Sequence, residues 1–465
     1  MSLHLYDSAT RSLREFVPLE PGKASLYLCG LTVQGPPHIG HARNWVTTDI
    51  LRRWLERSVP EKPGLEVSYV RNVTDIDDKI LLKSADEGEQ WYALAYRNER
   101  AIRSAEIALG CLPPTYEPRA TGHISEMIEL IERLIANGLA YAAEGDVFFD
   151  VKALPSYGSL SGQKVDEMEP AGDSAGDSRK RDPRDFALWK GHKPEEPLTA
   201  SWPTPWGRGR PGWHLECSAM ATKYLGPTFD IHAGGLDLIF PHHENELAQS
   251  SGAGDGFARY WVHNGMLNLG GKKMSKSVGN TLQVSEMVKQ FRPVELRYYL
   301  GSAHYRSVMD YSPEAIDEAG AAYRRIEGFV ARAGEIVGEP RPAELPEAFV
   351  AALNDDLGVP RALAVIHDTV SEGNKATDED EIDRYLRQVL DMTSVLGINP
   401  LEWSSEVSSD LTAVVDSLVQ VALEQRRAAR ERKDFVAADA VRDQLAEAGV
   451  IVEDTPAGPR WTLKG

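Results

Sequence analysis

The apolar positions near the start of the chain predict short buried strands that alternate with amphipathic helices. Residues 24–28 and 67–73 are short apolar runs with the length and composition of strands. Between them, after a Gly/Pro turn at 35–37, a helical pattern runs from 39 to 55. A second helix is expected to begin within 75–79. Strand, helix, strand, helix predicts a parallel sheet, with ligands at the carboxyl ends of its strands.

The pattern changes near residue 111, and we interpret the next stretch as an insertion that interrupts the sheet. Residues 124–137 have a helical pattern, and 139–142 with 147–150 predict a hairpin. A Gly/Asp/Ser stretch at 171–178 is typical of a loop. We expect the sheet to resume with three segments, at 213–220, 229–231 and 260–264.

The last third of the chain is predicted to be mostly helical. Ser312 as a cap and Pro313 in the first position mark the start of a helix. A linker rich in Pro and Glu, 338–346, separates it from helical segments around 349–353, 362–370 and 382–396. The tail is expected to form a helical stretch over 411–445 and then a hairpin of 450–452 with 460–463.

These patterns predict an α/β protein. Its core is a doubly wound (Rossmann-type) parallel sheet with an inserted subdomain, followed by a helical bundle and a small C-terminal unit. At 465 residues the chain is too long for a single core, which agrees with several domains. The expected segments are 1–110, 111–205, 206–265, 266–315, 316–410 and 411–465.

The composition indicates the class of protein and its cellular compartment, but it does not indicate a function. Hydrophobic residues make up 42% and charged residues 26%, as in ordinary globular proteins. We expect a cytoplasmic protein without a membrane span, because no leader and no apolar run of about 20 residues is visible. Only three cysteines occur, which favours a reducing compartment. The net charge of −19 disfavours average attraction to nucleic acid, yet a local basic face is enough for binding.

The first chemical candidate is His38-Ile39-Gly40-His41, here called the HIGH tetrapeptide. Two histidines three residues apart share one face of a helix. The prolines before them lead into a helix N-terminus, whose free N–H groups attract phosphate. Gly40 has no Cβ, so a flat base can lie against the backbone. The alternative is a pair of surface histidines at the start of a helix.

The second candidate, Lys273-Met274-Ser275-Lys276-Ser277, is here called the lysine loop. It follows a pair of glycines and is rich in lysine and serine, which is typical of a flexible cationic loop. Such a loop can close on a triphosphate and neutralise charge that develops in a transition state. The alternative is a solvated turn, but the ordered pair with the HIGH tetrapeptide favours nucleotide chemistry.

The third candidate is a metal site. His242 and Glu246 are four residues apart, so on a helix they point the same way. Cys29 and Cys217 could add two thiolates and complete a set of donors that zinc prefers. His243, three residues before Glu246, could replace His242, and Cys29 could instead be a small core residue. A zinc hydrolase is a further alternative, although the His-Glu-x-x-His spacing is absent.

Basic side chains gather in the predicted helix of the tail. Such residues contact the phosphates of nucleic acids, although a solvated helix face that includes Glu424 and Glu431 has the same composition. The basic residues are Arg426, Arg427, Arg430, Arg432 and Lys433.

Taken together, the sequence resembles the cysteinyl-tRNA synthetases, a family of class I aminoacyl-tRNA synthetases. The resemblance covers nearly the whole chain. The matching segments are 27–30, 38–41, 70–79, 211–220, 240–246, 274–277 and 452–461. The segment Gln34-Gly35-Pro36-Pro37 departs from the aromatic-Asp sequence that is usual in this family before the HIGH tetrapeptide.

The resemblance implies a reaction in two steps. L-cysteine and ATP, with Mg²⁺, give cysteinyl-adenylate and pyrophosphate, and the cysteinyl group then moves to the terminal ribose of tRNA(Cys). One Zn²⁺ per chain is implied, on Cys29, Cys217, His242 and Glu246. The implied cysteine pocket is Gly30, Thr74, Trp213 and Asp237. The implied ATP-binding residues are His38, Gly40, His41 and Lys276, and the catalytic residues are His38, His41, Lys273 and Lys276.

The resemblance also assigns roles to the predicted segments. Residues 1–110 and 206–265 would be the two halves of the catalytic domain, around a connective insertion at 111–205. Residues 266–315 would hold the lysine loop and contact the tRNA stem, 316–410 would form the helical bundle, and 411–465 would recognise the anticodon. We expect a monomer.

Two further alternatives share part of this chemistry. An adenylate-forming ligase that joins cysteine to an amino sugar would use the same nucleotide and zinc residues, but it would not need the tail from 411. A catalytically inactive RNA-binding paralogue is disfavoured because Lys273 and Lys276 are intact.

Overall fold

The computed structural model describes most of the chain and divides it into two compact units. The units are Met1–Pro400 and Leu401–Gly465. Three predicted segments fall wholly or partly outside the described residues, namely the loop at 171–178, the lysine loop at 274–277 and the linker at 338–346. The described residues are 2–59, 63–170, 177–270, 272–273, 282–337, 344–403, 409–455 and 458–463.

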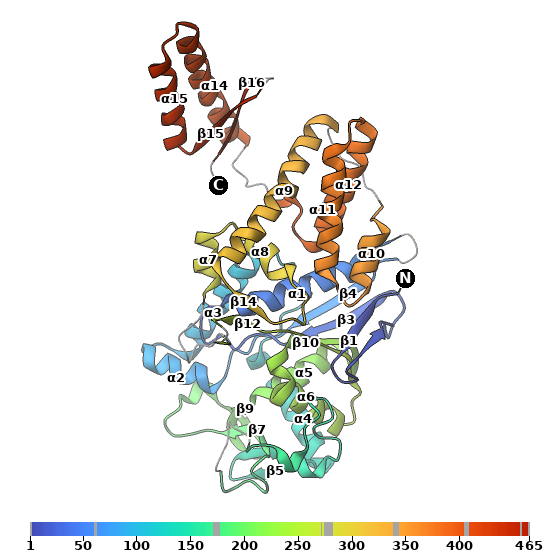
Figure 1. Cartoon of the computed structure of the whole chain (residues 1–465). Coiled ribbons are helices and arrows are strands. Elements are labelled where there is room, and N and C mark those ends of the chain that lie inside the picture. Colours follow the sequence, from blue (N-terminus) through green and yellow to red (C-terminus); the bar gives the residue numbers. More distant parts are fainter. Residues whose placement is uncertain are drawn as a thin grey trace. The chain divides into compact units, whose positions relative to one another are not determined.

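The centre of the first unit is a parallel sheet of four strands in the order β11-β10-β3-β4, which confirms the predicted α/β class (Figure 1). Helix α1 (Ile39–Glu56) connects β3 to β4, as the apolar pattern predicted. The halves meet where β10 pairs with β3, and in such sheets ligands bind beyond the carboxyl ends of the strands. The strands are β3 (Lys23–Leu28), β4 (Glu66–Arg71), β10 (Thr228–Gly235) and β11 (Phe257–Asn264).

The stretch between β4 and β10 contains the predicted insertion. Helices α2 (Asp78–Glu87) and α3 (Trp91–Ala108) come first, and α4 (Ile124–Ala136) follows. A separate antiparallel sheet then forms in the order β5-β6-β7-β9-β8, and its first hairpin is the one predicted. Its strands are β5 (Ala140–Ala143), β6 (Asp146–Phe149), β7 (Phe186–Gly191), β8 (Trp202–Thr204) and β9 (Gly207–Pro211).

The prediction that the sheet resumes at 213–220 was wrong, because these residues belong to helix α5 (Trp213–Leu225). Helix α5 contains a single β-branched residue, Thr222, and is rich in good helix formers. Residues 214–221 are all buried, so no polar face reveals the helical period. A short helix that is buried on nearly all sides cannot be distinguished from a buried strand by its pattern alone.

A short hairpin at the N-terminus was also missed. Strands β1 (His4–Asp7) and β2 (Ser12–Glu15) pair in antiparallel fashion. Each is only four residues long, which is too short for a two-residue period to be visible.

Beyond the main sheet, a small three-stranded sheet precedes the helical bundle. It consists of β12 (Leu267–Leu269), β13 (Lys272–Lys273) and β14 (Met309–Tyr311). Within the described residues, every helix is too short or too polar to traverse a lipid bilayer. The helices of this part are α7 (Val284–Gln290), α8 (Pro293–Ser302), α9 (Pro313–Val337), α10 (Glu347–Asn354), α11 (Val359–Lys375), α12 (Glu379–Leu396) and α13 (Pro400–Trp403). Helices α10, α11 and α12 lie where the sequence predicted them, at 349–353, 362–370 and 382–396.

The second unit contains a helical pair and the predicted C-terminal hairpin. The single helical stretch predicted over 411–445 is two helices, because Lys433 adopts a φ of 60° and the Asp434 side chain caps the next helix. A buried cluster of Val419, Leu423 and Val450 joins helix to hairpin. The elements are α14 (Ser409–Glu431), α15 (Phe435–Glu447), β15 (Val450–Thr455) and β16 (Gly458–Leu463).

Candidate metal centre and nucleotide pocket

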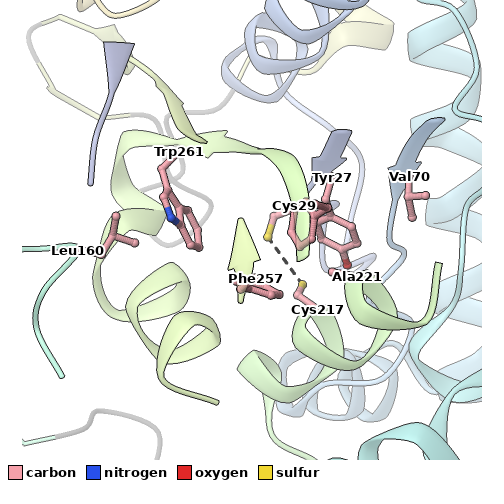
Figure 2. Packing of buried hydrophobic residues seen from close by; sticks show 9 residues of the cluster. Tyr27, Cys29, Val70, Leu160, Cys217, Ala221, Phe257 and Trp261 are labelled. Carbon is pink, nitrogen blue, oxygen red and sulfur yellow. Dashed lines mark hydrogen bonds between the residues drawn. The ribbon is translucent and has the colours of Figure 1, made fainter. Parts of the chain in front are cut away.

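Four potential metal donors from three distant segments meet beyond the end of β3. Cys29 follows β3, Cys217 lies on α5, His242 lies in the turn 239–243, and Glu246 lies on α6 (Glu244–Gly252). One ligand atom from each of the four lies within 4.8 Å of all the others. All four are at most 5% exposed, and Figure 2 shows the two sulfurs pointing toward each other inside an apolar cluster.

The spacing of these atoms fits a tetrahedral ion. The Sγ atoms of Cys29 and Cys217 are 3.7 Å apart. Cys29 Sγ is 3.3 Å from His242 Nε2 and 3.2 Å from Glu246 Oε1. His242 Nε2 and Glu246 Oε1 are 2.9 Å apart. Donors around tetrahedral zinc with bonds of about 2.0–2.3 Å are about 3.3–3.8 Å apart. The donors therefore need to move outward by only a few tenths of an ångström to enclose zinc.

The electrostatics of the cluster favour a cation. Burial raises the pKa of the Cys29 thiol well above its usual value. Burial opposes ionisation of Cys217 as well, but the hydrogen bond from Cys29 and the charge of His242 lower its pKa to about 6. His232 and His242 overcome burial and hold the pKa of Glu246 well below its ordinary value. A buried thiolate and a buried carboxylate within 4.8 Å of each other attract positive charge strongly.

A further layer of histidines orients two of the donors. His214 Nδ1 lies 2.9 Å from His242 Nδ1, and His232 Nε2 lies 2.9 Å from Glu246 Oε2. Such contacts fix the orientation of metal ligands. The sequence interpretation missed both of these histidines, because each lies far along the chain from the residue that it contacts.

The structure bears on the choice between His242 and His243. His243 also lies in a possible donor set, with Cys29, His232 and Glu246. However, its Nδ1 atom lies 2.7 Å from His263 Nε2, whereas His242 Nε2 faces both Cys29 and Glu246. The geometry therefore favours His242 as the donor.

A pocket of about 650 Å³ opens directly onto this cluster. Its lining includes residues predicted for the metal and for cysteine, and residues predicted for ATP. The first group is Cys29, Gly30, Trp213 and Asp237, and the second is His38, Gly40 and His41 of the HIGH tetrapeptide. It joins the two candidate sites in one cavity.

Gly30 and Thr74 are held together by a buried amide. Asn72 Oδ1 accepts a hydrogen bond of 2.8 Å from the Gly30 N–H, and Asn72 Nδ2 donates to Thr74 Oγ1 at 3.1 Å. A Cβ at Gly30 would lie 1.6 Å from the Asn72 carbonyl oxygen, so only glycine fits there. Thr74 is buried, with 1% of its surface exposed, and it is not among the residues that line the pocket.

The HIGH tetrapeptide lies at the N-terminus of α1, as predicted. His38 is the residue before the helix, and its N–H donates to His41 Nδ1 at 3.3 Å. The two imidazole rings stack with centroids 3.5 Å apart. Since both rings and Gly40 line the pocket, the helix N-terminus faces the space that a phosphate group would need.

Other parts of the pocket lining were not predicted. Lys79 lines it, with Nζ 6.0 Å from the centroid of the Trp213 ring, and that ring stacks on His242 at 4.2 Å. Asn44 and residues 264–267 line it as well. Lys79 lies in the segment 70–79 that carried the resemblance, so that segment was the available signal. Of the lysine loop, the structure describes only the backbone of Lys273, in strand β13.

Three family models match the chain. The model described as tRNA synthetases class I (C) catalytic domain matches residues 15–321. The DALR domain model matches residues 348–401. The model described as cysteinyl-tRNA ligase anticodon binding domain matches residues 409–461. This last match disfavours the amino-sugar ligase, which has no use for such a domain.

Curated relatives and solved structures agree with these matches. The chain is 57% identical to a cysteine--tRNA ligase of Streptomyces avermitilis over 100% of this chain and 99% of that protein, and 55% identical to one of Cutibacterium acnes over 100% and 97%. A Mycobacterium tuberculosis methionyl-tRNA synthetase bound by methionyl-adenylate shares the fold, with a TM-score of 0.58, 17% identity, and coverage of 82% of this chain and 92% of that chain. On these grounds the chain belongs to the cysteinyl-tRNA synthetases, within the class I aminoacyl-tRNA synthetases.

Proposed function

We propose that this chain activates L-cysteine with ATP and transfers the cysteinyl group to the 3′ end of tRNA(Cys). The observation that carries the proposal is that Cys29 belongs both to the buried donor cluster and to the lining of the pocket that holds the HIGH histidines. A substrate cysteine whose thiol is bound at the cluster would therefore have its carboxylate in the same pocket as the nucleotide.

We propose that the donor cluster holds one Zn²⁺ through Cys29, Cys217, His242 and Glu246. Cysteine must be distinguished from serine, a near-isostere, and pocket packing alone separates such pairs by only about 10²-fold. When bound, zinc supplies a strong preference for thiolate over hydroxyl. Selection of this kind needs no editing domain.

The remaining residues of the pocket would position the two substrates. Gly30, Thr74, Trp213 and Asp237 would surround cysteine, and the exposed Lys79 lies close enough to Trp213 to add positive charge there.

At the other end of the pocket, His38, Gly40 and His41 would bind ATP with its Mg²⁺ at the N-terminus of α1. Lys273 and Lys276 would neutralise charge on the phosphates as pyrophosphate leaves.

Each segment of the chain would have its own role. We propose that 1–110 and 206–265 form the catalytic halves, 111–205 the connective insertion, 266–315 the lysine loop and stem contact, 316–410 the bundle, and 411–465 the anticodon unit. The described residues of this pocket and of the donor cluster all lie in the first unit. We propose that the chain acts as a monomer. Three free cysteines, two of them donors, support a cytoplasmic location.

The direct test is an assay with each amino acid in turn. We expect ATP–pyrophosphate exchange to depend on cysteine, and charging of total tRNA to occur with cysteine alone. Exchange with cysteine that is followed by transfer to an amino sugar, and not to tRNA, would instead establish the alternative ligase. Absence of cysteine-dependent exchange would exclude both.

Removal of the C-terminal unit should separate the two steps. A chain that ends at Trp403 retains every described pocket and donor residue, so we expect its exchange rate to remain within about twofold of the full chain. We expect kcat/KM for tRNA charging to fall by about 10²-fold or more, because contacts to the tRNA are lost. Exchange and charging assays on the two chains check this, and intact charging would reassign the tail.

A variant of the full chain provides a milder comparison. Arg430 lies in the last turn of α14 and Arg432 directly follows this helix, where basic side chains can contact tRNA phosphates. We expect Arg430→Gln with Arg432→Gln to raise KM for tRNA and reduce its salt dependence, while exchange is unchanged.

A further inference from the structure

Arg43 is a charged residue that is completely buried on the helix of the HIGH tetrapeptide. It lies on α1, two residues beyond His41, and its exposed fraction is 0%. Its guanidinium donates to five backbone carbonyls. Nη1 reaches Gly265 O at 2.9 Å and Met266 O at 2.8 Å, and Nη2 reaches His304 O at 3.2 Å, Tyr305 O at 3.4 Å and Ser307 O at 2.6 Å.

This arrangement keeps the guanidinium charged without a carboxylate partner among the described residues. Burial lowers the pKa of Arg43 to about 10, which still leaves it protonated at neutral pH. Carbonyl dipoles thus replace water around the charge. A planar fork with five N–H donors can satisfy acceptors on two sides at once, which a lysine cannot do.

The five carbonyls belong to two segments of the chain that are hydrogen-bonded to each other. Residues 264–267 form part of the pocket wall, whereas 304–307 are outside the pocket lining. Gly265 N donates to Tyr305 O at 2.7 Å, and Met309 N donates to Met266 O at 2.9 Å. A Cβ on Gly265 would come within 2.3 Å of Ser307 O. The two segments are therefore in close contact, and Arg43 fixes both.

Arg43 thus connects two walls of one cavity. His38, Gly40 and His41 line one side at the start of α1, and 264–267 line another. A second connection joins the first wall to the chain beyond the lysine loop, because Ile39 N donates to Leu282 O at 2.9 Å and Val284 N donates to Pro37 O at 3.0 Å. Of the two connections, only the first depends on a side chain.

We propose that Arg43 is a positioning residue for adenylate formation, which sets the spacing between the HIGH histidines and the 264–267 wall where ATP binds. The inference rests on the proposed ATP site. Displacement of a binding wall by about 1 Å costs about 10²-fold in rate when reacting groups must be aligned. Arg43 touches no substrate and acts through the backbone that it holds.

The test is Arg43→Lys in the full chain, which keeps the buried charge but provides too few donors. With enzyme concentration set by titration of active sites, we expect kcat/KM for ATP in cysteine-dependent exchange to fall by about 30-fold or more. KM for cysteine should change less than about threefold, because the donor cluster and Trp213 are not contacted. Wild-type ATP kinetics in this variant would overturn the proposal.

A matched control comes from a second buried arginine. Arg297 on α8 binds Asp49 Oδ2 at 2.5 Å and the Leu396 carbonyl, and it is not part of the pocket lining. Arg297→Lys should lower the thermal midpoint as Arg43→Lys does, yet leave the titrated ATP kinetics unchanged. A fall in kcat/KM for ATP of equal size in both variants would reduce Arg43 to a purely structural role.

A second variant keeps the proposal testable if Arg43→Lys does not fold. Gly265→Ala pushes on Ser307 O and separates the two carbonyl segments while Arg43 is intact. It should also lower kcat/KM for ATP, and wild-type kinetics would contradict the proposal. Failure of the wild-type chain to exchange with cysteine would count against the proposed function instead, and ATP binding by calorimetry would then compare the variants.

Discussion

Cys217→Ser is expected to release the metal and to abolish most of the preference for cysteine over serine. The substitution replaces one of two sulfur donors with a hydroxyl, which is a poor ligand for zinc. Discrimination should fall to about 10²-fold, the level that pocket packing alone provides. Metal content by mass spectrometry, with exchange kinetics for cysteine and serine, measures both effects.

The third cysteine provides the control. Cys111 lies outside the donor set, with its Sγ 3.7 Å from Arg297 Nη1. Cys111→Ser should keep one zinc per chain and full selectivity. A Cys217→Ser protein that kept both would exclude zinc as the basis of selection.

Lys276→Ala should slow cysteine-dependent ATP–pyrophosphate exchange by about 10²- to 10³-fold. That is the usual cost of removing one group that stabilises charge in a transition state. The loss should appear in kcat, while KM for cysteine stays close to that of the unaltered chain, because the cysteine pocket is intact. Steady-state exchange at saturating ATP measures the effect.

A lysine elsewhere in the same region controls for the loss of charge. Lys289 on α7 is exposed and pairs with Glu286 at 2.7 Å. Lys289→Ala should leave exchange unchanged, because surface ion pairs contribute little. An exchange rate in Lys276→Ala equal to that of the control would remove Lys276 from the mechanism.

The main sheet could be predicted because its first half has clear local patterns. Strand β3, helix α1 and strand β4 each show their own period, so their order implied parallel pairing. Helix α5 could not be predicted, because it is buried on nearly every side. The break between α14 and α15 depends on a positive φ at Lys433. Lysine rarely adopts a positive φ, so the sequence did not indicate a break at this position.

The candidate site was only partly accessible from the residues themselves. The spacing of His242 and Glu246 indicated a metal, but the two cysteines lie far away along the chain, and the resemblance was needed to choose between His242 and His243. Arg43 was missed for a different reason. It lies on the buried stripe of α1 beside Ala42 and Val46, where the pattern alone does not show which atoms surround a charge.

The order of strands in the main sheet has a consequence for synthesis of the chain. Strand β10 occupies the edge of β3 opposite β4, but it is synthesised only after the whole insertion. Until then the nascent chain carries an unpaired strand edge, which is prone to associate with other chains. Cys217, His242 and Glu246 also follow the insertion in the chain, so a metal held by the four donors would bind only after β3 and β10 have both been made. Metal loading would therefore mark the joining of the two halves of the sheet.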